Sequence, residues 1–458
     1  MIQLPFAAGQ TYFILGYGLS GQAAAAALKA SGAEVLVWDD QDPVRQKAQN
    51  DGYTVANHTV LDKRKVSAIV CAPGVPLDHP APHPAIRAAR RNKISIISDL
   101  DLLFRAQPDA TFVGVTGTNG KSTTTALIAH ILKSAGRNVQ MGGNIGIAAL
   151  SLEPLDKSGF YVLELSSYQL DLIQMNPINV GVLLNITPDH IDHHGSMAGY
   201  VAAKKRLAQR GQPQTIVIGT DEPETQAMFG ELLATPNMTL YEVSVQHQVI
   251  QGVRAENQKL HASFESQPVD ISKIQTLPGK HNAQNAAAAF AACHALGLSR
   301  AEIETGLQSF TGLAHRQQLV ASLGGVRFVN DSKATNADAA AKALVCYDNI
   351  YWIIGGRAKA GGLNGLERFI APVRHAFIIG ECSDDFAAWC KGKIPFTCCG
   401  TLDVAVEKAA AMAWQDGQKD SCVLLSPATA SFDQYARFEE RGEHFARLVH
   451  DLTPPKAN

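Results

Sequence analysis

The sequence has 458 residues, of which 46% are hydrophobic and 18% charged. This is enough apolar material to bury several cores, and we expect three domains. Forty basic against forty-two acidic side chains leave a formal net charge of −2, so no strong overall field favours binding to nucleic acid or to a membrane surface. These numbers favour small-molecule partners.

The N-terminus has no basic segment followed by a long apolar run, and no apolar stretch approaches the ~18 residues of a membrane span. We therefore expect a cytoplasmic protein that does not contact the membrane. The eight cysteines contain no C-x-x-C pair, which argues against a disulfide framework and against a zinc ribbon. We expect reduced thiols, mostly packed in the core.

The first predicted strand leads into a glycine loop. GYGLSG, residues 16–21, fits G-x-G-x-x-G between an apolar run and an alanine-rich helical stretch, and Asp39 and Asp40 close the next apolar run. This pattern is typical of a dinucleotide fold, in which glycines let the backbone approach a diphosphate. Taken alone, it favours an NAD-dependent oxidoreductase.

Short β-branched runs alternate with amphipathic, alanine-rich segments along the whole chain. This alternation predicts the α/β class, with parallel sheets covered by helices on both faces. The first block includes AEVLVWDD and SAIVCAPGVP, and its boundary is expected between residues 100 and 110. A second block starts with a strand at residues 111–115.

A second phosphate loop, GTNGKSTTT, follows that strand. Gly117 and Gly120 let backbone N–H groups wrap a phosphate, Lys121 brings a positive charge to its oxygens, and Ser122 offers a hydroxyl to Mg²⁺. The spacing differs from the strict eight-residue pattern, because Val115 stands where its first glycine is expected. An ordinary kinase or GTPase is therefore disfavoured.

Three later features have both a functional and an ordinary structural interpretation. Glu164 closes the apolar run FYVL, so its carboxylate is either a metal ligand or half of a structural salt bridge. DHIDHH, residues 189–194, is either a hydrolytic metal site or a polar loop with one functional histidine. Lys204, in AAKKRL, lies on a predicted helix where a solvated basic face is the usual explanation.

A third block opens after FTGLAHRQQLV. Its expected strand-to-loop transitions lie in GVRFVNDSKAT, IYWIIGGRAKAGG, HAFIIGE and CVLLSPATASFDQYARFEERG. Because open α/β sheets bind ligands at the carboxyl ends of their strands, the polar residues after these runs are candidate binding residues.

Taken together, the motifs resemble the Mur ligase family over nearly the whole chain. The Lys121 loop is shared with a wider superfamily that includes folylpolyglutamate synthase. The segments that resemble the D-glutamate-adding members are GYGLSG, GGNIG at Gly142, ELSSYQL at Glu164, NITPDH at Asn185, NDSKATN at Asn330, and LLSPATASFDQYARFEERG from Leu424.

The resemblance implies three domains: a Rossmann-like domain for a UDP-sugar (residues 1–103), a central ATP-binding domain of the P-loop type (104–312), and a C-terminal Rossmann-like domain that closes over ATP and binds glutamate (313–458). It implies a monomer whose partners are UDP-N-acetylmuramoyl-L-alanine, D-glutamate and ATP, with no nucleic acid and no membrane. The implied reaction phosphorylates the alanine carboxylate to an acyl phosphate, and the amine of D-glutamate then displaces phosphate.

The resemblance also implies two Mg²⁺ ions, the first held by Ser122 and Glu164 and the second by His190 and a CO₂-derived carbamate on Lys204. The implied catalytic residues are Lys121, Glu164, His190 and Lys204. The implied ATP contacts in the loop are Gly117, Thr118, Asn119, Gly120, Lys121, Ser122 and Thr123. Asn282 and Asn285 are implied on the adenine side, Arg316 at phosphate and Asp331 at the ribose.

The GYGLSG loop then cradles the diphosphate of UDP rather than a nicotinamide cofactor. For the UDP-linked substrate, the implied contacts are Gly18, Leu19, Ser20, Asp39, Gly74, Asn144 and Ser166. For glutamate they are Thr335, Lys359, Ser431 and Phe438, with Lys359 pairing the side-chain carboxylate. Pro188 and Arg357 depart from the residues usual in the family.

Several alternatives stay open at this point. An NAD-dependent oxidoreductase leaves the Lys121 loop unexplained, a kinase explains only the second block, and a folylpolyglutamate-type ligase gives no reason for the first glycine loop. A non-catalytic nucleotide-binding scaffold is the plainest alternative. Asn282 and Asn285 are otherwise a helix N-terminal cap, and the Phe438 ring is otherwise a core side chain.

Overall fold

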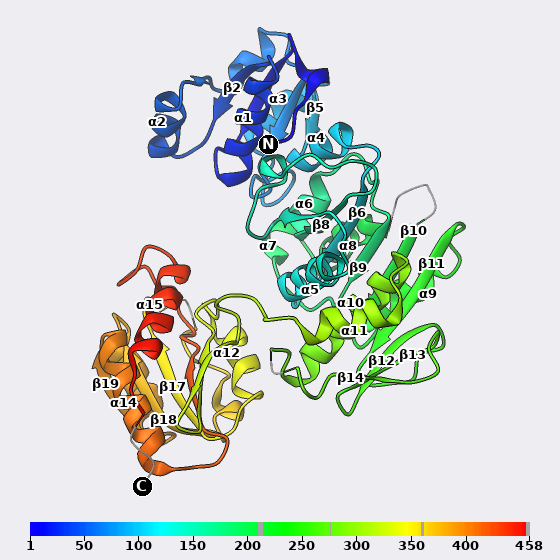
Figure 1. Ribbon diagram of the computed structural model, residues 1–458. Coiled ribbons are helices and arrows are strands. Elements are labelled where there is room, and N and C mark those ends of the chain that lie inside the picture. Colours follow the sequence, from blue (N-terminus) through cyan, green and yellow to red (C-terminus); the bar gives the residue numbers. More distant parts are fainter. Residues whose placement is uncertain (209–213, 275, 359–360, 455–458) are drawn as a thin grey trace. The chain divides into compact units, whose positions relative to one another are not determined.

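The computed structural model describes residues 1–208, 214–274, 276–358 and 361–454. It separates into two compact units, the first formed by Met1–Lys273 with Lys280–Phe310 and the second by Ile274–Gly279 with Thr311–Asn458. Three sheets of five, nine and six strands run through the chain (Figure 1). These sheets, with helices between their strands, confirm the predicted α/β class with three sheet-containing domains.

The first sheet has the strand order β3-β2-β1-β4-β5, and all its neighbours are parallel. The order reverses between β1 and β4, which is the place where open α/β sheets form a ligand crevice. The dinucleotide-type topology predicted from GYGLSG is therefore confirmed. Its elements are β1 (Thr11–Leu15), α1 (Leu19–Ala30), β2 (Glu34–Trp38), α2 (Asp42–Asn50), β3 (Thr54–Val55), β4 (Ala68–Cys71), α3 (Pro84–Arg91), β5 (Ser95–Ile97) and α4 (Asp99–Ala106).

The second sheet has the order β14-β13-β12-β11-β10-β9-β6-β8-β7. Its strands from β12 to β7 are parallel, and β13 and β14 add an antiparallel edge. The strands are β6 (Thr111–Thr116), β7 (Val139–Gly143), β8 (Phe160–Glu164), β9 (Val180–Leu183), β10 (Gln214–Gly219), β11 (Met238–Ser244), β12 (Gly252–Glu256), β13 (Lys259–Ala262) and β14 (Val269–Asp270). The helices are α5 (Lys121–Ser134), α6 (Ser167–Leu172), α7 (Ile191–His194), α8 (Met197–Lys205), α9 (Pro223–Leu232), α10 (Gly279–Ala295) and α11 (Arg300–Gln308).

One apolar core joins the first two sheets. The rings of Phe104 on α4 and Phe112 on β6 lie 4.9 Å apart, and Phe112 stacks on Tyr161 of β8 at 5.3 Å. The backbone N–H of Ile2 donates to Leu150 O at 3.1 Å. Aromatic pairs at such distances add to the stabilisation from burial, so the first and second sheets belong to one compact unit.

The third sheet has the order β15-β16-β20-β17-β18-β19, parallel except for the edge strand β15. Every residue of β17, IYWIIG, is buried, with Trp352 and Ile354 in one core and Tyr351 and Ile353 in another. This alternation follows from the two-residue period of a strand covered on both faces. The elements are β15 (Gln318–Leu323), β16 (Val326–Asn330), α12 (Ala337–Leu344), β17 (Ile350–Gly355), β18 (Val373–Ile379), α13 (Ser383–Cys390), β19 (Phe396–Gly400), α14 (Leu402–Asp416), β20 (Cys422–Leu425) and α15 (Phe438–Asp451).

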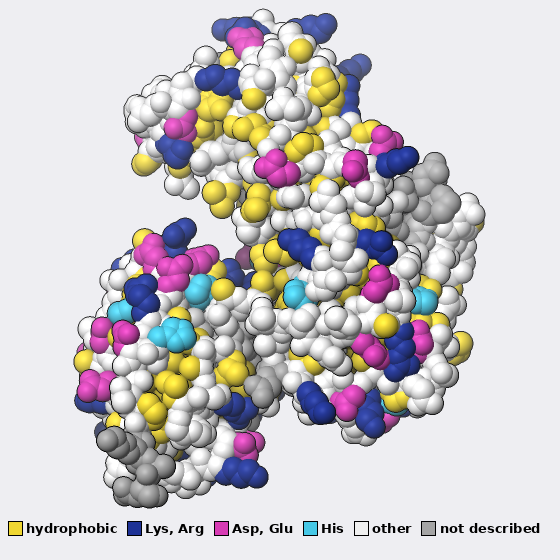
Figure 2. Space-filling view, viewed as in Figure 1, with side chains coloured by type: hydrophobic (Ala, Val, Ile, Leu, Met, Phe, Trp, Pro, Cys, Tyr) yellow, Lys and Arg dark blue, Asp and Glu magenta, His cyan; other side chains and the backbone are white. Residues whose placement is uncertain are grey.

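The eight cysteines are all free, and five of them are buried, as the sequence predicts; Cys398 is exposed. Among the described residues, no helix has the length and apolar content that a membrane span requires. Figure 2 shows acidic and basic side chains interspersed on the visible face, in keeping with the nearly balanced charge.

Candidate active site

The loop between β6 and α5 has the geometry of a phosphate-binding loop. Gly117 and Gly120 have φ angles of +154° and +84°, a backbone region that favours glycine. At Gly120 an added Cβ would lie 2.3 Å from Oδ1 of Asn285. The loop therefore turns tightly into the N-terminus of α5, and the N–H groups at a helix N-terminus are suited to bind an anion.

A side chain from the neighbouring strand end holds this loop in place. Oδ1 of Asn185, which follows β9, accepts from Asn119 N at 2.8 Å, and its Nδ2 donates to Asn119 O at 3.2 Å. The backbone of Thr118 donates to Asn185 O at 2.9 Å. The phosphate loop is thus preorganised before any ligand arrives.

Two lysine side chains meet at one carbonyl of the loop. Nζ of Lys121 donates to Gly117 O at 2.9 Å and to Thr118 O at 3.0 Å. Nζ of Lys204, on α8, also donates to Gly117 O at 2.9 Å and to Thr116 Oγ1 at 3.3 Å. Burial lowers the pKa of Lys204 well below its ordinary value, and the charge of Lys121 lowers it further.

The solvated basic face expected as the usual explanation is wrong for Lys204, whose side chain is only 1% exposed. Its neighbour Lys205 does form an exposed pair with Glu231. Arg206, in the same AAKKRL segment, is half-buried and donates to the carbonyl of Ile173. Helical position separates the three cations, because residues that follow one another point in different directions around the axis.

Glu164, at the end of β8, is 3% exposed. Its Oε2 accepts from Ser122 Oγ at 2.5 Å and its Oε1 from Asn144 Nδ2 at 2.7 Å. A buried carboxylate beside a hydroxyl, at the edge of a phosphate loop, is a donor set of hard oxygens that suits Mg²⁺. The residues present therefore fit a magnesium ion at Ser122 and Glu164.

A pocket of about 240 Å³ lies at this sheet edge. Its lining residues are Lys121, Asn144, Ser166, Ser167, Tyr168, His190, Tyr200 and Lys204. Seven of the residues assigned to phosphate, metal or substrate thus lie in or beside one pocket, since Glu164 accepts from Asn144 in its wall and Ser122 donates to Glu164. His190 enters it from a left-handed backbone conformation with φ of +54°.

Tyr168 and Tyr200 are pocket residues that the sequence analysis did not single out. The Tyr200 hydroxyl lies 3.1 Å from Thr118 Oγ1, its ring centre lies 4.8 Å from Lys204 Nζ, and burial raises its pKa to about 12. Tyr200 precedes Lys204 by four residues, which places both on one helix face. That spacing is the signal that could have identified it.

Asn282 and Asn285 lie inside α10 rather than capping it, so the helix-cap alternative is wrong. The helix begins at Gly279, both side chains are buried, and Asn285 Nδ2 donates to Asn282 Oδ1 at 3.0 Å. The approach of Asn285 to Gly120 places this pair beside the phosphate loop.

The first glycine loop lies between β1 and α1. An added Cβ on Gly21 would lie 2.0 Å from Gly16 O, whereas one on Gly18 would meet nothing within 4 Å. Asp39 holds the loop, since its Oδ2 accepts from Tyr17 N at 2.8 Å. Leu19 at the tip is 79% exposed.

Two more of the predicted substrate contacts flank that loop. Ser20 hydrogen-bonds the carboxyl group of Asp99, whose burial raises its pKa to about 6. Gly74 follows β4 in an open position, and an added Cβ there also meets nothing within 4 Å. Both glycines, 18 and 74, therefore leave room for a ligand at the point where the strand order reverses.

In the second unit, Asp331 follows β16 and is buried. It accepts from Ser426 Oγ at 2.8 Å and from Gln317 N at 3.2 Å, and burial raises its pKa to about 7. Arg316 is half-buried one residue before Gln317, and its positive charge partly offsets this rise. These two predicted nucleotide contacts thus lie close together.

The predicted glutamate contacts also belong to the second unit. Thr335 is half-buried after β16, Ser431 is 3% exposed, and Nζ of Lys333 lies 4.1 Å from the centre of the half-buried Phe438 ring. A purely core role for Phe438 is therefore wrong. Lys359 lies outside the described residues.

Of the two departures from the family pattern, Pro188 is exposed and Arg357 pairs with Glu381 at 3.1 Å.

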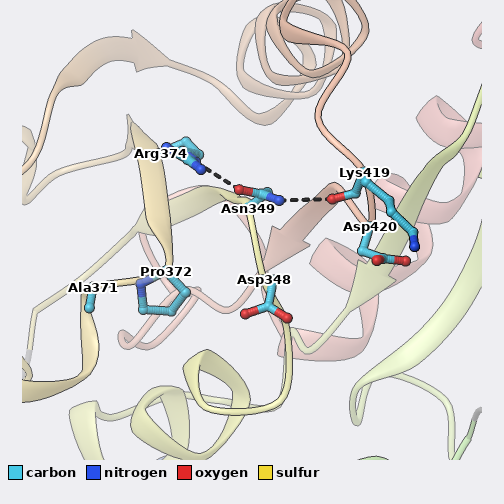
Figure 3. A pocket seen from close by; sticks show the side chains of 7 residues that line it. All are labelled: Asp348, Asn349, Ala371, Pro372, Arg374, Lys419 and Asp420. Carbon is cyan, nitrogen blue, oxygen red and sulfur yellow. Dashed lines mark hydrogen bonds between the residues drawn. The ribbon is translucent and has the colours of Figure 1, made fainter.

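A second pocket, of about 480 Å³, lies in the second unit (Figure 3). It is lined by Asp348, Asn349, Ala371, Pro372, Arg374, Lys419 and Asp420. Asn349 bridges its walls, accepting from Arg374 Nε at 2.8 Å and donating to Lys419 O at 2.8 Å. Because it opens at the amino ends of β17, β18 and β20, it is not at the sheet edge where α/β folds bind substrates.

Comparisons with known proteins agree with this geometry. Residues 115–293 match the Mur ligase middle domain, and residues 7–74 match the NADPH-binding domain of acetohydroxy acid isomeroreductase. Proteins named UDP-N-acetylmuramoylalanine--D-glutamate ligase are 46% identical to this chain in Paramagnetospirillum magneticum, with 98% of each chain covered, and in Agrobacterium fabrum, with 99% of this chain and 97% of the relative covered.

Solved structures show the same fold at lower identity. A UDP-N-acetylmuramate-alanine ligase from Thermotoga maritima gives a TM-score of 0.59 at 16% identity, with 96% of this chain and 99% of that chain covered. MurF from Acinetobacter baumannii gives 0.58 at 19% identity, with 98% and 93% covered.

Proposed function

The chain belongs to the Mur ligase family, and from this premise we propose that it joins D-glutamate to UDP-N-acetylmuramoyl-L-alanine with conversion of ATP to ADP and phosphate. One observation carries the chemistry. Lys121, Asn144, His190 and Lys204 line a single pocket at the phosphate loop, and Glu164 touches it through Asn144. An oxidoreductase function would not explain why these side chains gather at a phosphate loop.

The reaction begins with a carboxylate, which is a poor acyl donor because oxide is a poor leaving group. Its oxygen attacks the γ-phosphorus of ATP, the bond from that phosphorus to ADP breaks, and an acyl phosphate results. The loop N–H groups after Gly117 and the ammonium of Lys121 hold the phosphate oxygens and offset their growing charge. Mg²⁺ bound at Ser122 and Glu164 would supply further positive charge to the same oxygens.

In the second step the neutral amine of D-glutamate attacks the acyl carbon, the bond from that carbon to the phosphate oxygen breaks, and the nitrogen releases one proton as phosphate leaves. Asn144 is held by Glu164 at 2.7 Å and lines the pocket, so its amide is positioned to orient the reacting carboxylate. His190 lines the same pocket and, in this proposal, would contact the carboxylate and help to hold a second Mg²⁺. Ser166 lines this pocket as well.

Lys204 carries a carbamate in this proposal. Burial and the nearby charge of Lys121 lower its pKa, so the neutral amine that reacts with CO₂ forms at a lower pH than in a solvated lysine. The amine nitrogen forms a bond to the carbon of CO₂ and releases one proton, which replaces a buried cation with an oxygen-bearing anion. Such an anion is a ligand that a second Mg²⁺ prefers, whereas an ammonium repels a metal ion.

The remaining contacts complete the proposal. Gly18, Leu19, Ser20, Asp39 and Gly74 hold the UDP portion, because their loops meet at the crevice of the first sheet. In the second unit, Arg316 and Asp331 contact ATP, and Thr335, Lys359, Ser431 and Phe438 contact D-glutamate. We also propose that the protein is a cytoplasmic monomer, as the family resemblance implies.

The test is phosphate release by the purified protein with ATP, Mg²⁺ and UDP-N-acetylmuramoyl-L-alanine, comparing D-glutamate, L-glutamate and no amino acid. We expect release that depends on D-glutamate and a product heavier by one glutamyl residue. Dependence on L-glutamate would keep the ligase chemistry but overturn the assigned stereochemistry. No release with either amino acid would overturn the proposed acceptor.

A further inference from the structure

Two histidines beside the active site have no role in the reaction proposed above. His190 lines the pocket, but His193 and His194 lie against Asp171 of α6, and one ligand atom from each of the three lies within 4.8 Å of the others. We propose that Asp171, His193 and His194 form a binding site for a divalent transition-metal ion, Zn²⁺ in the first place, separate from the magnesium site at Glu164.

The donor set selects the kind of metal. Two imidazole nitrogens and one carboxylate oxygen suit Zn²⁺ and its neighbours in the first transition row, whereas Mg²⁺ prefers oxygen ligands throughout. Zinc bonds of ~2.0–2.1 Å put neighbouring ligand atoms roughly 3.4 Å apart in a tetrahedral site. The distances between the three ligand atoms therefore need to shorten by at most roughly 1.4 Å. Rotation of the half-buried His193 and Asp171 side chains can provide this change.

The protonation of the two rings favours a metal. Burial lowers the pKa of His193, and burial together with nearby positive charge lowers that of His194 to about 4. Burial thus favours the neutral form of both rings, which is the form that binds a metal ion. Burial also raises the pKa of Asp171, although Arg206 and His193 oppose this rise.

The surrounding side chains orient these ligands. The Ser167 hydroxyl lies 2.9 Å from Nε2 of His194, and the Tyr168 ring packs on His193 with ring centres 4.0 Å apart. Outer contacts of this kind fix the orientation of metal-binding imidazoles. His79 lies next to them, since an added Cβ on Gly195 would be 2.6 Å from its Nε2, and this ring or a water is available as a fourth ligand.

A metal at this site would link α6 to α7. His190 is the residue before α7, so the link would also restrain the backbone that carries His190 into the pocket. The binding site itself does not depend on the proposed ligase function, because none of its three ligands takes part in that reaction.

The test uses the full chain freed of metal, with Mg²⁺ in excess to fill sites that prefer oxygen ligands. Zn²⁺ is titrated in competition with a chromogenic chelator. We expect one zinc ion per chain, and Asp171→Asn and His193→Asn should each weaken binding by about tenfold or more. His247→Asn is the matched control, because His247 also lies beside a carboxylate, 3.0 Å from Glu242, but outside the proposed triad.

Unchanged zinc affinity in Asp171→Asn and His193→Asn would overturn the proposal, as would equal loss in His247→Asn. Circular dichroism of each variant without metal shows whether it is folded. A measurement on the unaltered chain covers the case in which a variant does not fold: Co²⁺ should give the visible absorption of a four-coordinate site, and Zn²⁺ should abolish it. Absence of that absorption would also overturn the proposal.

Discussion

The chain contains two glycine loops with the same local backbone architecture but different side chains around them. Each follows a parallel strand, β1 or β6, and leads into a helix through a glycine at positive φ, +89° at Gly16 and +84° at Gly120. The first loop, GYGLSG, contains no charged side chain, and Leu19 is exposed at its tip. The second is surrounded by Lys121, Lys204 and the carboxylate of Glu164.

This difference shows which part of a phosphate site performs chemistry. Backbone N–H groups at a helix N-terminus are sufficient to bind a diphosphate, and both loops have them. Transfer of a phosphoryl group needs cations placed where charge develops, and in the described residues these surround the second loop. We therefore expect the first loop to bind and the second to react, and the following changes should separate the two roles.

The largest effect should come from Lys121→Ala. Loss of the cation at the transferred phosphate should lower kcat by roughly 10³-fold, with little change in affinity for the UDP-linked substrate. Lys133→Ala is the matched control, since Lys133 is an exposed lysine on the same helix. The measurements are phosphate release and binding of the UDP-linked substrate. A variant with normal kcat would contradict the division of roles.

Lys204→Ala should lower kcat by about 10²-fold, because the anion proposed for this position is lost. Lys205→Ala, which removes only a surface pair with Glu231, should keep near-normal activity. Isotopically labelled bicarbonate should give a carbamate signal by carbon nuclear magnetic resonance in the unaltered protein and lose it in Lys204→Ala. Full activity in this variant would rule out the carbamate role.

Asp331 should make ATP binding depend on pH. Its pKa is raised to about 7, so the carboxylate that accepts ribose hydroxyls forms as the pH rises through 7, and the KM for ATP should fall by up to about tenfold over that range. Asp331→Asn should remove this dependence. Equal pH profiles for the two proteins would show that another group is responsible.

The same group affects stability. The pKa of Asp331 is higher in the folded than in the unfolded chain, so its contribution to folding is present at low pH and is lost as the pH rises through 7. The midpoint temperature of thermal unfolding should therefore fall more steeply between about pH 4 and pH 7 in the unaltered protein than in Asp331→Asn. Parallel declines would contradict the assignment.

The smallest effect should come from Gly18→Ala. The substitution meets nothing within 4 Å, so the fold should be unaffected, but a methyl group at the loop surface should raise the KM for the UDP-linked substrate by about tenfold without changing that for ATP. Gly230→Ala, exposed on α9 with equal space, is the control. An equal rise in both KM values would argue against a UDP site at this loop.

The sequence predicts the fold well where the signal is local. GYGLSG and GTNGKS each identify a strand, a tight turn and a helix, because glycine at positive φ and apolar periodicity are properties of a short segment. The order of the strands, and the antiparallel edge strands β13, β14 and β15, come instead from long-range pairing. No short segment contains that information.

The candidate site could be predicted only in part. Lys204 looks like one member of a surface cluster, and its burial depends on how α8 packs against β6. DHIDHH identifies a group of histidines, but the left-handed turn at His190 sends that ring to the pocket while His193 and His194 lie with Asp171. Tertiary contacts, rather than residue type, decide which polar side chains act together.

The most direct test of the central claim follows one oxygen atom. If the second loop phosphorylates the carboxylate of the UDP-linked substrate, displacement by D-glutamate must leave one oxygen of that carboxylate on the phosphate. With isotopically labelled oxygen in the carboxylate of UDP-N-acetylmuramoyl-L-alanine, mass spectrometry should find one labelled oxygen in each phosphate released. Phosphate without label, formed together with the amide product, would contradict the acyl phosphate and the role given to the second loop.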